Sequence, residues 1–418
     1  MKKIIFPIIL IFSFGVKIIF PQGECWTAKT DMSVERCAMP VVVLNDTIYV
    51  IGGSVTQNIS TEVVEVYDAV TDSWTYKADL PKKLVGTTAC VVNGKIYVVG
   101  GLTSIYGQAV DSVYEYNPNL NSWTRKTNIP TPIGFACAGV VNGKIYVIGG
   151  APSKWEWGYN TVYEYDPATD TWTQKAQMPS RRFLASATVV DGKIYVFGGA
   201  WDDTMRGLYT VEVYDPSDDS WTVIVRMPIP RGGHASCAID GKIYILTGGS
   251  TFSILYDDVL EYNPSLGTWV EKTCIPTPRV APAACSIGGK IYVFGGMDIN
   301  NVRLSTVEEY DPALDTTNII FVGVDNNSTI SVTFKLEQNY PNPFNPVTTI
   351  TYSIPSTSHV RLSVFNILGQ EVAVLINEVR EAGNYNVEFY GSDLAGGVYF
   401  YRLSTENFTQ IKKMLLVK

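Results

Sequence analysis

A pair of adjacent glycines recurs six times along the chain at nearly constant spacing. The pairs begin at Gly52, Gly100, Gly149, Gly198, Gly248 and Gly295, and successive pairs are 48, 49, 49, 50 and 47 residues apart. Each pair closes a block like Lys95 to Gly101, and a tryptophan follows five of them, at Trp74, Trp123, Trp172, Trp221 and Trp269. A period of this length is typical of repeated supersecondary units, each of which needs its neighbours to bury its apolar face.

Each repeat predicts four short antiparallel strands. The first two are joined by Asn-Gly or Asp-Gly, as at Asn93-Gly94 and Asp191-Gly192, which predicts two-residue hairpins. A third strand ends at Tyr-Asp-Pro or Tyr-Asn-Pro, and a fourth begins at the tryptophan. Four such strands with paired glycines predict one blade of a β-propeller. The repeats resemble those of the kelch family.

The sixth repeat lacks its tryptophan, and the missing piece stands near the N-terminus. Thr316-Thr317 occupies the place where the period expects tryptophan, whereas Trp26 to Lys29 matches Trp74 to Lys77. We therefore expect residues 24–317 to form a six-bladed kelch-type propeller in which the N-terminal strand completes blade six. This closure removes an open sheet edge that would otherwise favour aggregation.

The composition changes after residue 317. Residues 318–335 predict a linker, and residues 336–418 hold alternating segments at Thr348–Ile354, Val360–Phe365, Tyr385–Phe389 and Val398–Leu403. Such segments, separated by glycine and proline, predict a small immunoglobulin-like β-sandwich. The fold class expected for the whole chain is all-β.

Several motifs of this last segment resemble the type A sorting domain of the type IX secretion system. They comprise Asn339, Tyr340, Pro341, Asn342, Pro343, Phe344, Asn345 and Pro346, the glycine of Asn366 to Gln370 (Gly369), and Lys412, Lys413 and Met414. The resemblance implies contact with the secretion machinery, passage across a Gram-negative outer membrane, and later removal of this domain. A stand-alone adhesive sandwich is the alternative.

The N-terminus predicts export as well. Lys2-Lys3 followed by the apolar run Ile4 to Val16 has the layout of a signal peptide, with cleavage expected near Gly23. A retained anchor is the alternative, and no later stretch is apolar enough to cross a membrane. The expected location of the mature protein, without a transmembrane span, is the medium or the outer-membrane surface.

Charge and histidine content exclude some classes of function. With 32 basic and 40 acidic residues, the net charge of −8 disfavours duplex nucleic acid as a partner, since duplex binding needs cations that neutralise phosphates. Between residues 24 and 318 the only histidine is His234. A multi-histidine metal centre is therefore not expected, and neither is a cofactor.

The seven cysteines do not predict a disulfide framework, although the protein is expected to be exported. Cys90, Cys237 and Cys285 each lie seven residues before the tyrosine of their block, on the first strand of different blades. Cys137 lies two residues earlier in the same strand of its own blade, and hence on the same face. Buried thiols are the favoured interpretation. One bridge among Cys25, Cys37 and Cys274 is left open.

Side chains that depart from the repeat point to one mouth of the propeller. Trp155, Trp157 and Trp201 follow the glycine pairs of blades three and four, in loops that should share a mouth with the segments leading into each first strand. Those lead-in segments carry Arg36, Arg182, Arg231 and Arg279, whereas blades two and three have Leu84 and Ile133. The loops that follow the glycine pairs of the blades also carry Tyr106, Tyr159, Arg206, Phe252 and Tyr256, which we expect at the same mouth.

Two interpretations of the arginines compete. A repeated arginine can serve the repeat itself, by bonding carbonyl groups or a neighbouring blade. Alternatively, the arginines and the aromatic residues together form a mouth that binds an anion or a sugar. His234 resembles a packed first-strand histidine more than a catalytic one, and no catalytic residue is assigned.

The sequence thus predicts a secreted or surface-displayed propeller that binds a carbohydrate or a protein. The alternative is a sugar-acid epimerase or mutarotase, because some bacterial kelch-like propellers that resemble this chain have such activities.

Overall fold

The computed structural model describes residues 25–56, 58–153, 157–200, 207–251, 254–317, 319–321, 335–339, 341–354, 358–380, 383–392, 394–405 and 408–417. Every regular element in these ranges is a β-strand or an isolated bridge. Within the same ranges there is no helix long and apolar enough to cross a membrane.

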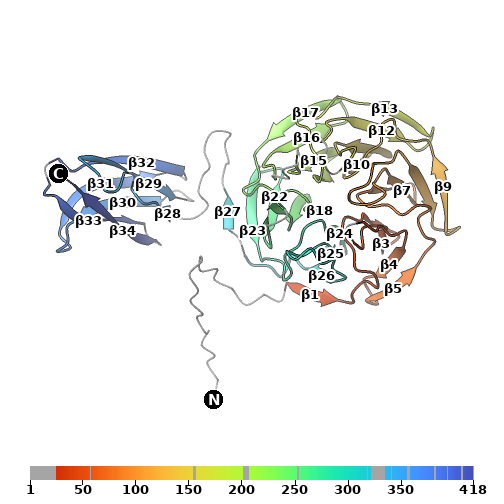
Figure 1. Ribbon diagram of the computed structural model, residues 1–418, viewed down its shortest axis with the longest axis horizontal. Coiled ribbons are helices and arrows are strands. Elements are labelled where there is room, and N and C mark those ends of the chain that lie inside the picture. Colours follow the sequence, from red (N-terminus) through yellow and green to blue (C-terminus); the bar gives the residue numbers. More distant parts are fainter. Residues whose placement is uncertain are drawn as a thin grey trace, which may run out of the picture.

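Six antiparallel sheets are arranged around a central axis and form a six-bladed propeller (Figure 1). The first strands of the blades line the axis and are β2 (Val41–Leu44), β6 (Thr88–Val92), β10 (Cys137–Val141), β14 (Ser186–Val190), β18 (Ala235–Ile239) and β24 (Ala283–Ile287). The second strands are β3 (Thr47–Ile51), β7 (Lys95–Val99), β11 (Lys144–Ile148), β15 (Lys193–Phe197), β19 (Lys242–Leu246) and β25 (Lys290–Phe294).

The third and outer strands complete the blades. The third strands are β4 (Val64–Asp68), β8 (Val113–Asn117), β12 (Val162–Asp166), β16 (Val211–Asp215), β22 (Val259–Asn263) and β26 (Val307–Tyr310). The outer strands are β5 (Ser73–Tyr76), β9 (Ser122–Lys126), β13 (Thr171–Gln174), β17 (Ser220–Ile224) and β23 (Thr268–Lys272), and in blade six β1 (Trp26–Lys29). A small hairpin of β20 (Gly249–Thr251) and β21 (Ile254–Leu255) follows the second strand of blade five.

The dipeptide turns form because their residues tolerate positive φ. Asn93 and Gly94 have φ of 49° and 72°, as a tight turn between first and second strands requires. The second strands bury nearly all their apolar side chains between neighbouring blades, whereas the first strands alternate buried and half-buried side chains. The Gly-Gly blocks therefore fold as second strands that are covered on both faces.

A closed ring of backbone hydrogen bonds joins the six blades just before their first strands. Its members all have φ between 52° and 63° and are Ala38, Gly86, Phe135, Leu184, Gly233 and Ala281. Each N–H donates to the carbonyl of the equivalent residue in the preceding blade, over 2.7 to 3.1 Å. The ring fixes the relative positions of the segments that lead into the blades.

The N-terminal strand closes the circle. β1 pairs antiparallel with β26, with Trp26 opposite Tyr310 and their ring centroids 4.8 Å apart. The indole N–H of Trp26 donates to the carbonyl of Thr273, which follows the outer strand of blade five. The N-terminal strand and the last repeat of the propeller are thus held in one sheet.

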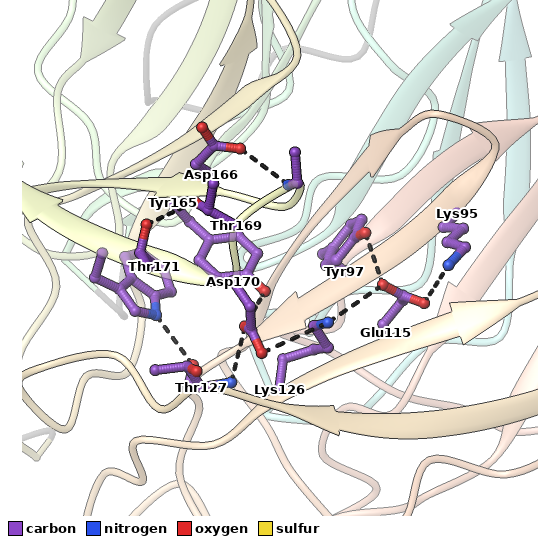
Figure 2. A network of polar contacts seen from close by, with 12 residues as sticks. Lys95, Tyr97, Glu115, Lys126, Thr127, Tyr165, Asp166, Thr169, Asp170 and Thr171 are labelled. Atoms are coloured by element: carbon purple, nitrogen blue, oxygen red, sulfur yellow. Dashed lines mark hydrogen bonds and ion pairs between the residues drawn. The ribbon is translucent and has the colours of Figure 1, made fainter.

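Neighbouring blades are also joined by polar side chains, as Figure 2 shows between blades two and three. Lys126 Nζ lies 3.9 Å from Glu115 Oε2 and 3.6 Å from Asp170 Oδ2 of the next blade. Glu115 also accepts hydrogen bonds from Lys95 and Tyr97, and Asp170 accepts one from Tyr165. Burial alone would raise the pKa of both carboxyls, but these partners outweigh it and lower the pKa of each.

Part of the segment interpreted as a linker belongs instead to blade five. β27 (Ile319–Phe321) pairs antiparallel with β23 and makes this blade a five-stranded sheet. Lys272 Nζ donates to the carbonyl of Thr317 at 3.1 Å, just before that strand. The expectation of a continuous linker over 318–335 is therefore wrong at its beginning, because the free edge of β23 offers backbone groups that a following segment can pair with.

The C-terminal segment forms a two-sheet sandwich. One sheet has the order β28 (Lys335–Leu336), β29 (Val347–Ile354), β32 (Gly383–Tyr390), and the other β31 (Glu371–Arg380), β30 (Ser358–Phe365), β33 (Gly397–Ser404), β34 (Thr409–Leu416). Side chains from both sheets share one apolar core, which includes Ile350, Tyr352, Leu362, Tyr401 and Met414.

The predicted sorting motif is packed into this sandwich. Asn339 is buried and its side-chain amide donates to Pro341 O and Thr348 Oγ1. Phe344 lies in the core, and its backbone pairs with Leu415 near the C-terminus. Lys412 and Lys413 directly precede buried Met414 on the last strand, while Tyr340 lies outside the described residues. The motif therefore joins the start of the domain to its final strand.

Candidate binding site at one mouth of the propeller

Two sets of segments meet at the same mouth of the propeller. Because the strands of a blade alternate in direction, the loop after the second strand and the segment after the outer strand lie at the same end. Backbone hydrogen bonds link loops of adjacent blades there, from Ala109 to Pro152 at 2.8 Å and from Gly207 to Ser250 at 2.9 Å. These bonds join the loops of blades two and three and those of blades four and five, and the bond from Arg182 N–H to Tyr159 O joins the loop of blade three to the segment leading into blade four. The loops of these blades therefore form one surface.

An open hollow of about 500 Å³ lies on this surface between blades three and four. It is lined by Trp157, Ser180, Arg181 and Leu208. Trp157 keeps 58% of its surface exposed, and Arg181 is exposed as well. No ion pair joins Arg181 to another residue within the described ranges. The hollow thus combines an accessible indole with an accessible guanidinium.

Close backbone packing holds Trp157 in place. A Cβ added to Gly158 would lie 2.9 Å from backbone atoms of Arg182, so only glycine fits beside that segment. The backbone N–H of Arg182 donates to the carbonyl of Tyr159 at 3.0 Å. These contacts bring the loop of blade three against the segment that carries Ser180 and Arg181.

Ser180 connects the hollow to a buried ion pair. Its hydroxyl donates to Glu212, and Glu212 Oε1 lies 2.6 Å from Nη2 of Arg182. Both side chains of the pair are almost completely buried. Burial lowers the pKa of Arg182, and the Glu212 carboxylate opposes that shift. The Ser180 hydroxyl is thereby oriented while its oxygen can still accept a hydrogen bond from a ligand.

The four repeated arginines do not open toward the mouth. Each is completely buried and pairs with a carboxylate near the third strand of its blade: Arg36 with Glu65, Arg182 with Glu212, Arg231 with Asp258 and Arg279 with Glu308. Each also donates to the carbonyl of a residue at the end of the second strand, such as Gly52 or Gly198. These guanidinium groups are enclosed and paired, which agrees with the interpretation that the repeated arginines serve the repeat and not with contact to a ligand.

His234 is buried too. Its Nε2 lies 2.8 Å from Ser186 Oγ, on the first strand of blade four. Burial, together with the nearby charges of Arg231 and Arg182, lowers the pKa of His234 to about 3. The imidazole is therefore neutral at physiological pH and only weakly basic.

The remaining predicted mouth residues differ in their placement. Tyr159 is half-buried and packs against the apolar cluster between blades two and three, whereas Tyr106 is 40% exposed. The Tyr256 ring centroid lies 5.1 Å from the guanidinium carbon of Arg231. Four further residues lie outside the described residues: Trp155, Trp201, Arg206 and Phe252.

Three of the four residues that line the hollow were missed by the sequence analysis. Arg181 stands directly before a repeated arginine, where other blades have Glu35, Lys83, Pro132, Pro230 and Pro278. That departure from the repeat could have singled it out. Ser180 and Leu208 carry no comparable signal, because small and aliphatic residues are common throughout these segments.

No disulfide joins any two of the seven cysteines, all of which lie in the described ranges. Burial raises the pKa of Cys90, Cys137 and Cys237 to about 12, so these side chains are protonated thiols. They pack within the apolar clusters between blades.

Comparison with known families agrees with both parts of the fold. A family model described as the KLHDC2/KLHL20/DRC7 kelch-repeats domain matches residues 38–178 and 86–296, and the kelch motif matches residues 278–316. A secretion system C-terminal sorting domain matches residues 338–418. A search of curated proteins finds no significant match.

Solved structures show the same propeller architecture. A structure described as that of YjhT has a TM-score of 0.60 and 17% sequence identity, covering 67% of this chain and 95% of its own. At this identity the likeness concerns the fold alone. The matches to family models together span more than half of the chain. The chain therefore belongs to the kelch-repeat family and carries a C-terminal sorting domain for type IX secretion.

Proposed function

We propose that this exported kelch propeller binds a carbohydrate in the hollow between blades three and four. The observation that carries the proposal is the exposed indole of Trp157 beside the exposed guanidinium of Arg181 in one hollow. Aromatic faces stack on the apolar faces of sugar rings, and a guanidinium binds hydroxyl or carboxylate oxygens. A volume of about 500 Å³ lies within the usual range for ligand sites.

The charges favour a sugar that carries a carboxylate. Arg181 is an exposed cation, whereas the repeated arginines are already paired with carboxylates. A guanidinium held near the oriented hydroxyl of Ser180 suits a ligand with both an anionic and a hydroxyl group. An acidic glycan is therefore the preferred ligand class.

A protein ligand is the second candidate, and a different observation favours it. The loops after the second strands of blades one, five and six expose large aliphatic side chains, at Ile59, Ile254, Ile299 and Val302. Exposed apolar residues gathered at one mouth are typical of a protein-binding surface. A broad protein interface would use these residues, whereas a small glycan would not reach them.

The alternative of a sugar-acid epimerase or mutarotase requires a general base that reaches the ligand. His234 does not suit this role, because it is buried and its pKa is about 3. The binding function is therefore preferred over catalysis.

Glycan-array binding of the chain without residues 1–23 tests the proposal. Trp157→Ala should weaken binding by about 1–3 kcal/mol, and Arg181→Ala should weaken acidic glycans more than neutral ones. The sequence-based prediction for Trp155→Ala and Trp201→Ala has the same direction and size. Matched controls are Tyr390→Ala and Arg125→Ala, which remove an exposed aromatic and an exposed cation elsewhere. If the parent chain binds no glycan on the array, the protein ligand is favoured instead, and Ile254→Ser and Ile299→Ser become the variants that test it.

A further inference from the structure

Two large aliphatic side chains stand next to each other in solvent at one turn of the sorting domain. Ile367 is 71% exposed and Leu368 is 77% exposed, in the turn between β30 and β31. These are the highest values for large apolar side chains in the described part of this domain. Neither residue belongs to the core cluster that joins the two sheets. The folded domain therefore does not need them for its packing.

The backbone holds this exposed pair in a fixed turn. Asn366 Oδ1 accepts hydrogen bonds from the N–H groups of Leu368 and Gln370, both at 3.0 Å. The N–H of Asn366 donates to Gln370 O, and the N–H of Gly369 donates to Asn366 O, also at 3.0 Å. Gly369 has φ of 76°, which favours glycine at this position. The turn is ordered by polar contacts, and its two apolar side chains remain free to meet a partner.

An ordered turn of this kind suits insertion into an apolar pocket. Exposed aliphatic pairs lower solubility unless something covers them, and an ordered loop loses little conformational entropy on binding. A stable symmetric dimer usually buries on the order of 1,200–2,000 Å², far more than two side chains supply. A pocket in a larger partner fits the feature better than a second copy of this chain.

The family match indicates which partner that is. Residues 338–418, which include this turn, match a secretion system sorting domain, so the domain is recognised by secretion machinery. We propose that Ile367 and Leu368 are inserted into an apolar pocket of that machinery and form a contact by which the exported chain is selected. This inference is independent of the carbohydrate proposal for the propeller.

Export of the full chain in a host with a type IX secretion system tests the proposal. We expect the double variant Ile367→Ser with Leu368→Ser to reduce the amount reaching the cell surface or medium at least tenfold, with folded protein accumulating in the periplasm. Deletion of residues 336–418 sets the level of complete loss. The matched control is Val379→Ser, which removes a 64% exposed aliphatic side chain near the other end of β31 and should leave export unchanged.

Two further measurements make the outcome decisive. Thermal unfolding of the periplasmic protein should give the same midpoint for the double variant and the parent. If the double variant is unstable, the single variant Leu368→Gln, which alters only a solvent-exposed side chain, decides in its place. Normal export of a stable variant would overturn the proposal. A concentration-dependent dimer of the parent that the variant abolishes would also overturn it, in favour of a second copy of the chain.

Discussion

At the scale of single residues, one pair of equivalent positions is filled by a buried ion pair in some blades and by apolar side chains in others. Blades one and four place an arginine before the first strand and a glutamate on the third strand, as Arg182 and Glu212 show. Blade three has Ile133 and Tyr163 at the same positions, and both lie in one apolar cluster. In blade three arginine and glutamate are thus replaced together. Blade five has Leu260 at the glutamate position, and its Arg231 pairs with Asp258 instead, as expected of a buried charge that must be neutralised.

This pairing predicts the result of a double substitution in blade four. Arg182→Ile alone should lower the free energy of unfolding by about 3–5 kcal/mol, because Glu212 is left buried and unpaired. Adding Glu212→Tyr reproduces the pair of blade three and should recover at least half of the loss. Urea unfolding followed by fluorescence measures both values. A double variant no more stable than the single one would show that the ion pair is not the reason for the pattern.

Of the predicted mouth residues, Trp157 leaves the repeat and lines the hollow, whereas the arginines that follow the repeat are buried and paired. Trp157 was predicted because a blade core has no use for an extra tryptophan after the glycine pair, and it is exposed. The repeated arginines were misplaced because their carboxylate partners are distant in sequence, as with Arg36 and Glu65. Comparing the same column of every third strand would have revealed the partners in blades one, four and six, but not Asp258, which precedes the third strand of blade five.

At the scale of strands, the short N-terminal strand β1 contributes to the stability of the whole propeller by completing blade six. β1 supplies the outer strand of blade six, and Cys25 just before it lies in the apolar cluster between blades five and six. We predict that a chain beginning at residue 32 melts several degrees or more below one beginning at residue 24, because the loss of β1 exposes the edge of β26. Differential scanning calorimetry compares the two. Equal melting temperatures would contradict closure by this strand.

The strands within repeats were predictable because turn residues and apolar alternation agree in every copy. β27 was not, because its pairing with β23 depends on a free edge elsewhere in the fold rather than on a local signal. In the sandwich, β31 and β34 were missed for a related reason. Both lie at sheet edges with many exposed side chains, as Ile411 illustrates, so their apolar alternation is weak.

At the scale of the whole molecule, acidic groups couple the stability of the propeller to pH. Hydrogen bonds and ion pairs outweigh burial and lower the pKa of Glu115, Glu164, Glu309, Asp170 and Asp219. A carboxyl with a lowered pKa stabilises the fold above its unfolded pKa of roughly 4, and that contribution is lost as pH falls through the folded value.

The melting temperature should therefore be nearly constant from neutral pH down to about pH 5 and fall steeply below pH 4. Glu308 works in the opposite sense, because burial raises its pKa, but it is a single group among several. Asp170→Asn should flatten the acid limb of the curve, since it removes one of the titrating carboxylates between blades two and three. A melting temperature that rises on acidification would contradict this account.

The most direct measurement of the central claim is a crystal structure of the propeller with the glycan that binds it most tightly on the array. We predict a sugar ring against the face of Trp157, with a carboxylate or hydroxyl oxygen within hydrogen-bonding distance of Arg181. A glycan bound at the opposite end of the propeller, near turns such as Asn93-Gly94, would contradict the assignment of the site.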